Sequence, residues 1–164
     1  MKRIVPLIIA ALLIVADQAS KLAVVALIPL NTVGWASGGD FLWLVHVRNT
    51  GVAFSMGNNL PDWLRVGLFI LIPLGVMIAF LVYYWRDATM TQLQRWSLAL
   101  IVAGGLGNQV DRIFRPEGVV DFLSFRLYGL FGMERFAIFN VADVCINVGG
   151  ALFVLSLLFG MRKR

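Results

Sequence analysis

Two residue types that often carry chemistry are nearly absent from this chain, which has one histidine, His46, and one cysteine, Cys145, among 164 residues. A single cysteine excludes an internal disulfide, and the apolar run around it indicates an inert packing thiol. One histidine and one cysteine are too few nitrogen and sulfur ligands for an ordinary zinc site. We therefore expect no metal, no cofactor and no Ser–His or Cys–His nucleophilic set.

Charged residues are also scarce, at 14% of the chain, whereas 60% of the residues are hydrophobic and the mean hydropathy is +0.84. Soluble domains are about 45–50% apolar, so this is the composition of a membrane protein. The net charge of +5 comes mostly from residues at the ends of apolar runs. That pattern is typical of orientation in a membrane, and we expect no nucleic-acid binding. The length predicts a single domain over residues 1–164.

Four apolar segments are long enough to cross a bilayer, which needs roughly 20 residues. They are about Ile4–Leu30, Leu64–Trp85, Trp96–Ile113 and Asn140–Gly160. Lys2 and Arg3 ahead of the first segment are also typical of a signal peptide. The apolar run resumes at Leu22 and continues to Leu30, however, which is longer than a signal peptide allows, so we expect a retained span.

Four spans place both termini on one side of the membrane. That side carries seven basic residues and one acid: Lys2, Arg3, Arg86, Arg95, Arg162, Lys163, Arg164 and Asp87. The two connections on the other side, residues 31–63 and 114–139, carry four basic and five acidic residues. The positive-inside rule then predicts cytoplasmic termini and extracytoplasmic connections.

The first of these connections contains a strand-like stretch. Residues 41–48, FLWLVHVR, are rich in β-branched and aromatic residues, NTG at 49–51 has turn chemistry, and VAFSM follows. This pattern predicts a short hairpin or small sheet, which its apolar side chains would hold on the membrane surface. The predicted fold is an all-α membrane protein with four transmembrane helices and a small extracytoplasmic β-sheet.

Ionisable residues within a span are candidates for function because burying them there costs roughly 2.5–3.5 kcal/mol or more. Asp17 and Lys21 lie four residues apart in the first span, in the order that favours a helical pair. A neutralised structural ion pair is the reading that we favour for them, because buried charges are usually paired.

The third span ends in GGLGNQVDRI, residues 104–113. Its three glycines leave room for a neighbouring helix to approach closely. Asn108 and Arg112 share a helix face, and Asp111 is three residues from Asn108. Arg112 near a helix end can reach the headgroups by itself, whereas Asn108 needs hydrogen-bond partners from other helices. We therefore expect this cluster to organise a polar site.

Two further aspartates have unusually apolar surroundings. Asp121 lies between valines and Phe122, and Asp143 shares a face of the fourth span with Asn140. Two carboxylates in a poorly solvated site share a proton, because both cannot ionise easily. Such a pair suits aspartic proteolysis and equally suits a proton relay in a transporter, and the residues alone leave both open. A non-enzymatic helix-bundle assembly protein is a third reading.

Five sequence blocks resemble those of bacterial lipoprotein signal peptidase, or signal peptidase II. In chain order they are DQASK at 17–21, VRNTGVAFS at 47–55, GGLGNQVDRI at 104–113, GVVDFLSF at 118–125 and FNVADVCINVG at 139–149. The resemblance covers nearly the whole chain and includes the four-span layout. Residues 126–136, RLYGLFGMERF, match no block, so the shape of that connection is not predicted.

The resemblance implies a membrane aspartic endopeptidase whose catalytic pair corresponds to Asp121 and Asp143. It cuts prolipoproteins on the amino side of a cysteine that already carries diacylglycerol. The positions that line or support the family's site correspond to Asp17, Lys21, Asn49, Gly51, Asn108, Arg112 and Asn140. For Asp111 we expect a structural role, and for Arg112 either contact with substrate carbonyls or support of its neighbours.

The resemblance also implies where the protein works and what it meets. We expect a multi-pass protein of the bacterial cytoplasmic (inner) membrane, with the active site near the outer face. Its partners would be a prolipoprotein with a diacylglyceryl-cysteine and the membrane lipid, and the cyclic peptide globomycin would inhibit it. Nothing in the sequence requires more than one copy, so we expect a monomer.

Overall fold

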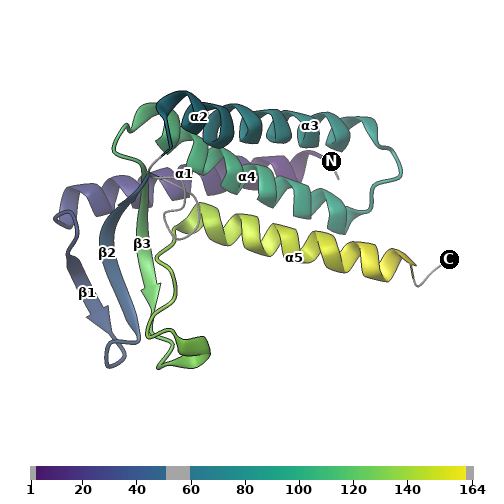
Figure 1. The fold of residues 1–164 in the computed structure, drawn as a ribbon. Coiled ribbons are helices and arrows are strands. Elements are labelled where there is room, and N and C mark those ends of the chain that lie inside the picture. The colour runs from purple at the N-terminus through teal and green to yellow at the C-terminus, as the bar shows by residue number, and fades with distance from the viewer. Residues whose placement is uncertain (1–2, 51–59, 162–164) are drawn as a thin grey trace.

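Long helices lie side by side, and a small sheet stands at one end of them (Figure 1). The computed structural model describes residues 3–50 and 60–161. In chain order its elements are α1 (Ile4–Leu27), β1 (Val33–Ser37), β2 (Leu42–Asn49), α2 (Asp62–Val66), the π-helix η2 (Gly67–Leu71), α3 (Ile72–Arg86), α4 (Gln92–Phe114), β3 (Val119–Phe125), the 3-10 helix η3 (Leu130–Gly132) and α5 (Val141–Met161). Because α2, η2 and α3 follow one another without a break, they form one helical rod.

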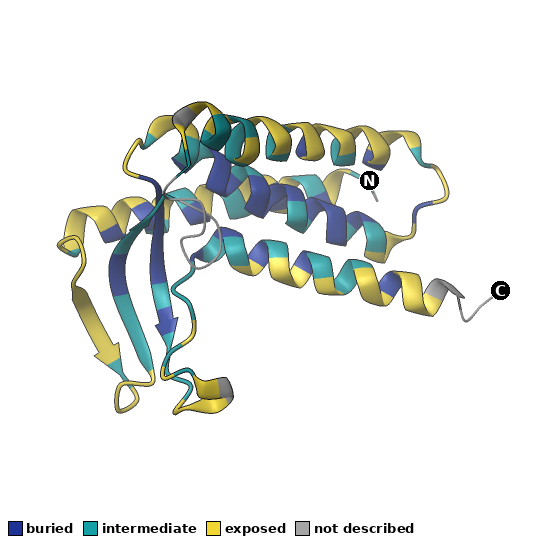
Figure 2. Cartoon of the chain, in the orientation of Figure 1, coloured by how far each residue is buried: buried dark blue, intermediate teal, exposed yellow. Residues whose placement is uncertain are grey.

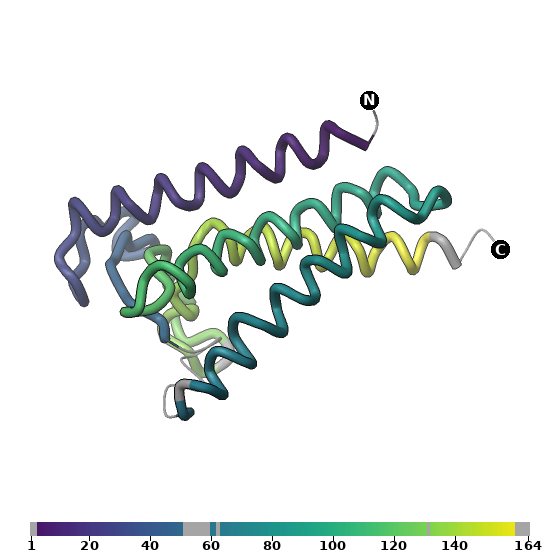
Figure 3. The backbone as a smooth tube through the Cα atoms, turned by 90° about the horizontal axis from the view of Figure 1, so that it is seen from above, coloured from purple at the N-terminus to yellow at the C-terminus, as the bar shows by residue number. Residues whose placement is uncertain are grey.

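The two ends of the bundle differ in what they carry. The start of α1, the α3–α4 connection and the end of α5 lie at the end far from the sheet, as Figures 1 and 3 show. The three strands and the connection from β3 to α5 lie at the opposite end. This agrees with the predicted two-sided layout, in which residues 31–63 and 114–139 share one side.

Helix α4 is the centre of the bundle and packs against α1, α3 and α5 (Figure 3). Twelve of its 23 residues are buried, which Figure 2 shows as a dark band along the helix. Within residues 3–50 and 60–161, three helical stretches are long and apolar enough to cross a membrane, Ile4–Leu27, Trp63–Arg86 and Val141–Phe159. Helix α4, the third predicted span, is more polar because its side chains face protein.

The glycines of α4 allow the close approach that the sequence predicts. A Cβ atom on Gly104 would collide with the carbonyl oxygen of Ala142 in α5. One on Gly107 would lie 2.9 Å from a carboxylate oxygen of Asp17 in α1. The backbone of α4 therefore touches two neighbouring helices directly, and the prediction of small residues at a helix interface is confirmed.

The sheet is antiparallel, in the order β1-β2-β3. The predicted strand at 41–48 is confirmed as β2, and it belongs to a small sheet as expected. It pairs with β1, which precedes it, and with β3, whereas the expected partner VAFSM lies outside the described residues. Strand β3 is buried along most of its length, so its mostly apolar sequence lacks the alternation that marks a half-buried strand.

The connection from β3 to α5 runs back along the sheet. Backbone hydrogen bonds join Phe139 to Phe122 and Leu123 of β3 at 2.8–3.0 Å. The next residue, Asn140, immediately precedes α5. This return path brings the start of α5 beside β3, although the sequence matched no known block there.

Candidate active site

Asp121 and Asp143 line one cavity of about 660 Å³. Asp121 belongs to β3 and is only 4% exposed, whereas Asp143 lies in the first turn of α5 and is half-buried. Apolar side chains of η2 and α3 and the segment before α5 form much of the remaining wall. The two carboxylates that the sequence singles out therefore share one partly apolar space.

Asn140 connects the two carboxylates. Its side-chain Nδ2 donates to Asp121 Oδ1 at 2.7 Å, and its backbone N–H donates to Asp143 Oδ2 at 3.0 Å. Its Oδ1 in turn accepts from the backbone N–H of Asp143 at 2.9 Å. The reciprocal bonds form a capping box at the start of α5, so one residue caps the helix and fixes the second carboxylate.

Two further asparagines complete the surroundings of the pair. Asn49 Nδ2 at the end of β2 donates to Asp121 Oδ2 at 3.1 Å, and Asn108 Nδ2 of α4 donates to Asp143 Oδ1 at 2.8 Å. Burial, the largest cause, and the charge of Asp143 together raise the pKa of Asp121 to about 6, against the lowering effect of the Asn49 and Asn140 hydrogen bonds. Asp121 thus holds a proton at a pH where an exposed aspartate does not.

Arg112 places a positive charge in the wall of this cavity. Its guanidinium interacts electrostatically with Asp121, Asp143 and Asp111. A guanidinium also offers a planar set of hydrogen-bond donors, so a peptide carbonyl entering the cavity would meet a donor there.

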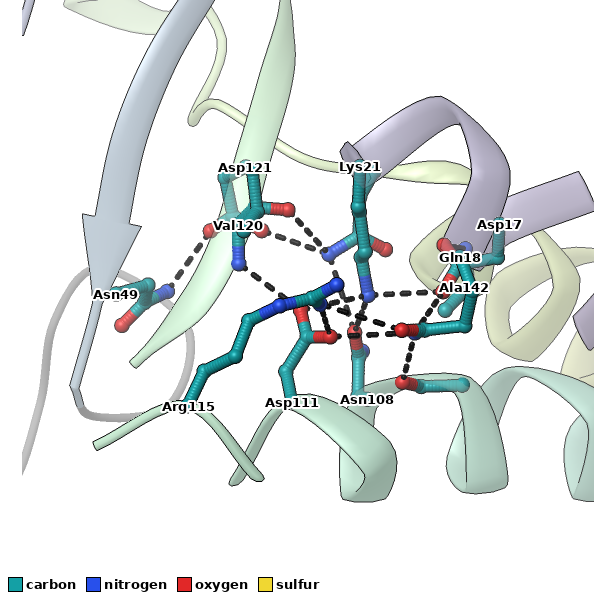
Figure 4. A network of polar contacts seen from close by, with 12 residues as sticks. Asp17, Gln18, Lys21, Asn49, Asn108, Asp111, Arg115, Val120, Asp121 and Ala142 are labelled. Carbon is teal, nitrogen blue, oxygen red and sulfur yellow. Dashed lines mark hydrogen bonds and ion pairs between the residues drawn. The ribbon is translucent and has the colours of Figure 1, made fainter. Parts of the chain in front are cut away.

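A fully buried lysine lies behind the cavity. Lys21 Nζ is 2.9 Å from Asp17 Oδ2 and 3.1 Å from Asp111 Oδ2, and it donates to Asn108 Oδ1 at 3.0 Å (Figure 4). An ammonium group has three donors, and here three acceptors surround it. The predicted ion pair of Asp17 and Lys21 is confirmed, and it is part of a larger network.

This network holds the two backbone segments that carry the candidate pair. Asp17 Oδ1 accepts from the backbone N–H of Ala142, the residue before Asp143, at 2.9 Å. Asp111 Oδ2 accepts from the backbone N–H of Val120, the residue before Asp121, at 3.0 Å (Figure 4). Each structural aspartate therefore fixes the residue next to one cavity aspartate, which gives Asp111 the structural role expected of it.

Sequence reasoning missed two members of the network. Gln18 Nε2 donates to Asp17 Oδ2 and Asp111 Oδ1, each at 3.1 Å, and to the Gly107 carbonyl at 2.9 Å. Arg115 pairs with Asp111 and donates to Gln18 Oε1 at 3.2 Å. The four-residue spacing of Asp111 and Arg115 was a usable signal. Gln18 gave none, because adjacent residues on a helix do not face one another.

Comparison with known proteins shows the family of this chain. Residues 9–159 match the family described as signal peptidase (SPase) II. The chain is 42% identical over 152 residues to the lipoprotein signal peptidase of Treponema pallidum (strain Nichols), covering 93% of this chain and 82% of the relative. It is 41% identical to that of Borreliella burgdorferi (strain ZS7), covering 92% and 88%. This chain belongs to the signal peptidase II family.

Solved structures show the same fold. One bacterial membrane enzyme determined by the in meso method at 2.3 Å matches with a TM-score of 0.84 and 26% identity, over 98% of this chain and 91% of that chain. Another, at 1.9 Å, matches with a TM-score of 0.79 and 27% identity, over 94% and 92%. With its apolar helices, the signal peptidase II chain is a multi-pass membrane protease of the bacterial inner membrane.

The predicted site residues fall into two groups in the signal peptidase II fold. Five line the cavity: Asn49, Asn108, Arg112, Asp121 and Asp143. Asp17, Lys21 and Asn140 are buried behind it. Gly51 lies outside the described residues. The second group supports the first through hydrogen bonds, a division that the sequence did not reveal.

Proposed function

We propose that the protein is an aspartic endopeptidase that removes signal peptides from diacylglyceryl-modified prolipoproteins. It would cut on the amino side of the lipidated cysteine. The observation that carries this proposal is the joining of Asp121 and Asp143 through Asn140 at one cavity. The names of the relatives, lipoprotein signal peptidases, support the substrate class.

In the proposed mechanism the two carboxylates share one proton. Asp121 carries it, since burial raises its pKa to about 6, and polarises the scissile carbonyl. Asp143 takes a proton from water as the general base, and the resulting hydroxide attacks the carbonyl carbon. Asp121 gives its proton to the carbonyl oxygen, and the tetrahedral intermediate forms. The C–N bond then breaks as Asp143 gives its proton to the cysteine amine. In the same step Asp121 takes back a proton from one hydroxyl of the intermediate, so the signal peptide leaves as a carboxylic acid and the pair again holds one proton.

The remaining site residues position the substrate and the pair. Asn49 holds Asp121 from the β2 side, and Arg112 offers donors to substrate carbonyls. Gly51 would permit close approach of an extended peptide to the backbone. Lys21 and its two carboxylate partners keep β3 and α5 at a fixed separation.

We also propose the orientation in the membrane. All four helical rods of the single domain, residues 1–164, would cross the bilayer, with α4 shielded from lipid by the other three. Positive charge at the end far from the sheet favours cytoplasmic termini. Exposed Val33, Trp35 and Phe41 on the sheet suit contact with the outer membrane surface, where a lipid-held cysteine and water can meet at the site. The protein would act as a monomer without metal or cofactor.

The deciding experiment is cleavage of a purified prolipoprotein followed by gel shift. We expect the purified membrane protein to release the signal peptide from diacylglyceryl-modified substrate and to leave the unmodified prolipoprotein intact. Globomycin should block the reaction. Absence of cleavage under conditions where a known lipoprotein signal peptidase is active would reject the proposed function, whereas insensitivity to globomycin alone would reject only the inhibitor assignment.

A further inference from the structure

The helical rod formed by α2, η2 and α3 is irregular where it faces the catalytic cavity. Its middle stretch η2 is a π-helix, and Pro73 follows two residues after it ends. Leu68, Phe69 and Pro73 all line the cavity. π-helical turns within α-helices occur frequently at functional sites, and proline removes a backbone donor. The irregular part of the rod is therefore also a wall of the cavity.

Pro73 removes the α-helical donor of one carbonyl group. In an α-helix the carbonyl oxygen of Phe69 would accept from the N–H of residue 73, and Pro73 has none. Gln109 of α4 supplies a donor instead, since its Nε2 donates to the Phe69 oxygen at 2.8 Å. A side chain of the central helix thus repairs the hydrogen bond that proline removes.

Gln109 itself occupies an unfavourable position for an amide. It is 2% exposed, and its Oε1 is buried with no hydrogen-bond partner among residues 3–50 and 60–161. A buried polar atom without a partner costs free energy that an apolar residue of the same size would avoid. The bond to Phe69 accounts for an amide at this position.

Little else fixes this wall by packing. No described residue of η2 is buried. A Cβ atom on Gly67 or Gly75 would meet no atom within 4 Å, so packing does not require glycine at either place. Glycine and proline both weaken a helix interior. A stretch with these residues and no buried side chain depends on specific bonds to keep its position.

We propose that Gln109 is a positioning residue that holds the η2 wall against α4 and so sets the width of the substrate cavity. This rests on the proposed function, because it takes the cavity as the place where the prolipoprotein binds. The wall residues are apolar, so the part of the substrate that they meet is apolar too. Gln109 acts on substrate binding through Phe69, and the proton transfers of the dyad do not involve it.

The first test is Gln109→Met, which keeps the length of the side chain and removes the donor. We expect KM for a diacylglyceryl-modified prolipoprotein to rise about five- to tenfold, the effect of one lost hydrogen bond. The value of kcat should stay within about twofold, and the pH profile should be unchanged. Gln92→Met, an exposed position at the far end of α4, is the matched control and should leave KM unchanged.

The second test supplies the missing donor from the backbone. Pro73→Ala gives residue 73 an N–H for the Phe69 carbonyl, so adding Gln109→Met to Pro73→Ala should raise KM less than about twofold. An equal rise in both backgrounds would overturn the proposal, as would a fall in kcat or a shifted pH profile in Gln109→Met.

Failure of the proposed function would be visible separately, as absence of cleavage by the unsubstituted protein. The unsubstituted protein, Gln109→Met, Pro73→Ala and the double variant can then still be compared by amide hydrogen exchange over residues 67–75. Gln109→Met should speed exchange there when Pro73 is present and have little effect when alanine replaces it. Equal acceleration in both backgrounds would again reject the role of Gln109.

Discussion

Two pairs of aspartates lie within one polar network, and their surroundings differ. Asp17 and Asp111 are buried around Lys21, at 2.9 and 3.1 Å from its Nζ. Asp121 and Asp143 line the cavity, and the hydrogen bonds described for them come from amide groups. Both pairs come from different segments of the chain, so proximity of carboxylates does not by itself separate them.

The two pairs differ in the charged group beside them and in whether their carboxylates line the cavity. The ammonium group of Lys21 lies within ion-pair distance of both Asp17 and Asp111, so buried charges of opposite sign are paired there. The cavity pair is instead held by amide donors beside the guanidinium of Arg112, and in the proposed mechanism it shares one proton. The first pair therefore suits a rigid frame, and the second suits acid–base chemistry. Substitutions in either pair, or at the residue that joins Asp121 to Asp143, test this difference.

The largest effect is expected from neutralising the cavity pair. Asp121→Asn or Asp143→Asn should reduce prolipoprotein cleavage by about 10³-fold or more, because each carboxylate has its own proton-transfer step. The variants should still fold and insert, as judged by thermal unfolding in detergent. Glu134→Gln, which removes an exposed ion pair with Arg126, is the control and should cleave normally. Full activity in either aspartate variant would contradict the assignment of Asp121 and Asp143 as the catalytic pair.

Removing the lysine should take away the cation that Asp17 and Asp111 share. Lys21→Met removes the ion-pair partner of Asp17 and leaves Asp111 paired with Arg115, and we expect a loss of about 3–5 kcal/mol in the free energy of unfolding. Adding Asp17→Asn should restore part of it. The measurement is thermal or denaturant unfolding in detergent, with the exposed Arg86→Met as the control for lost charge. Unchanged stability in Lys21→Met would mean that the fold does not depend on the ion pairs of Lys21 with Asp17 and Asp111.

The pH dependence of stability should distinguish the two pairs. The pKa of Asp121 is about 6 in the folded protein against an ordinary value of 3.8, so the folded state binds this proton more tightly. The stabilisation of the folded state by this proton is fully present below about pH 4 and is lost as the pH rises to 6. Its maximum is roughly 3 kcal/mol in the free energy of unfolding. The melting temperature of the wild type relative to Asp121→Asn should therefore fall between pH 4 and 6. Parallel curves would contradict the raised pKa.

The smallest effect concerns the residue that joins the cavity pair. Asn140→Ala should slow cleavage about 10- to 100-fold through the lost bond to Asp121, and it should destabilise α5 by about 1 kcal/mol through the lost cap. Asn140→Ser keeps a capping oxygen and lacks the amide donor. The serine variant should regain the wild-type melting temperature and still cleave prolipoprotein slowly. Recovery of both properties by serine would show that capping, and not the bridge, is the contribution of Asn140.

The sequence was sufficient for the helices, the candidate pair and most supporting residues. Apolar runs of spanning length predict helices because lipid imposes a simple rule on them. Asp121, Asn108 and Asp143 are noticeable because polar residues are rare in such surroundings. The family resemblance then assigned roles that spacing alone left open between a protease and a proton relay.

The parts that could not be predicted depend on long-range contacts. Strand β1 is exposed and short, and the alternation of β3 is hidden by burial on both faces, so neither shows a strand pattern. The roles of Gln18 and Gln109 arise from neighbours about 90 and 40 residues away, Asp111 and Phe69. No local pattern encodes such partners.

Under the proposed mechanism, the capping box of α5 should make catalysis sensitive to heat. Asp143 is held by the first turn of a helix, and terminal turns open with far less free energy than the whole protein. Fraying of that turn would break the bonds from Asn140 to both carboxylates, and the bundle behind it would stay folded. Turnover in this enzyme should therefore decline at temperatures below its melting point, and the loss should reverse on cooling.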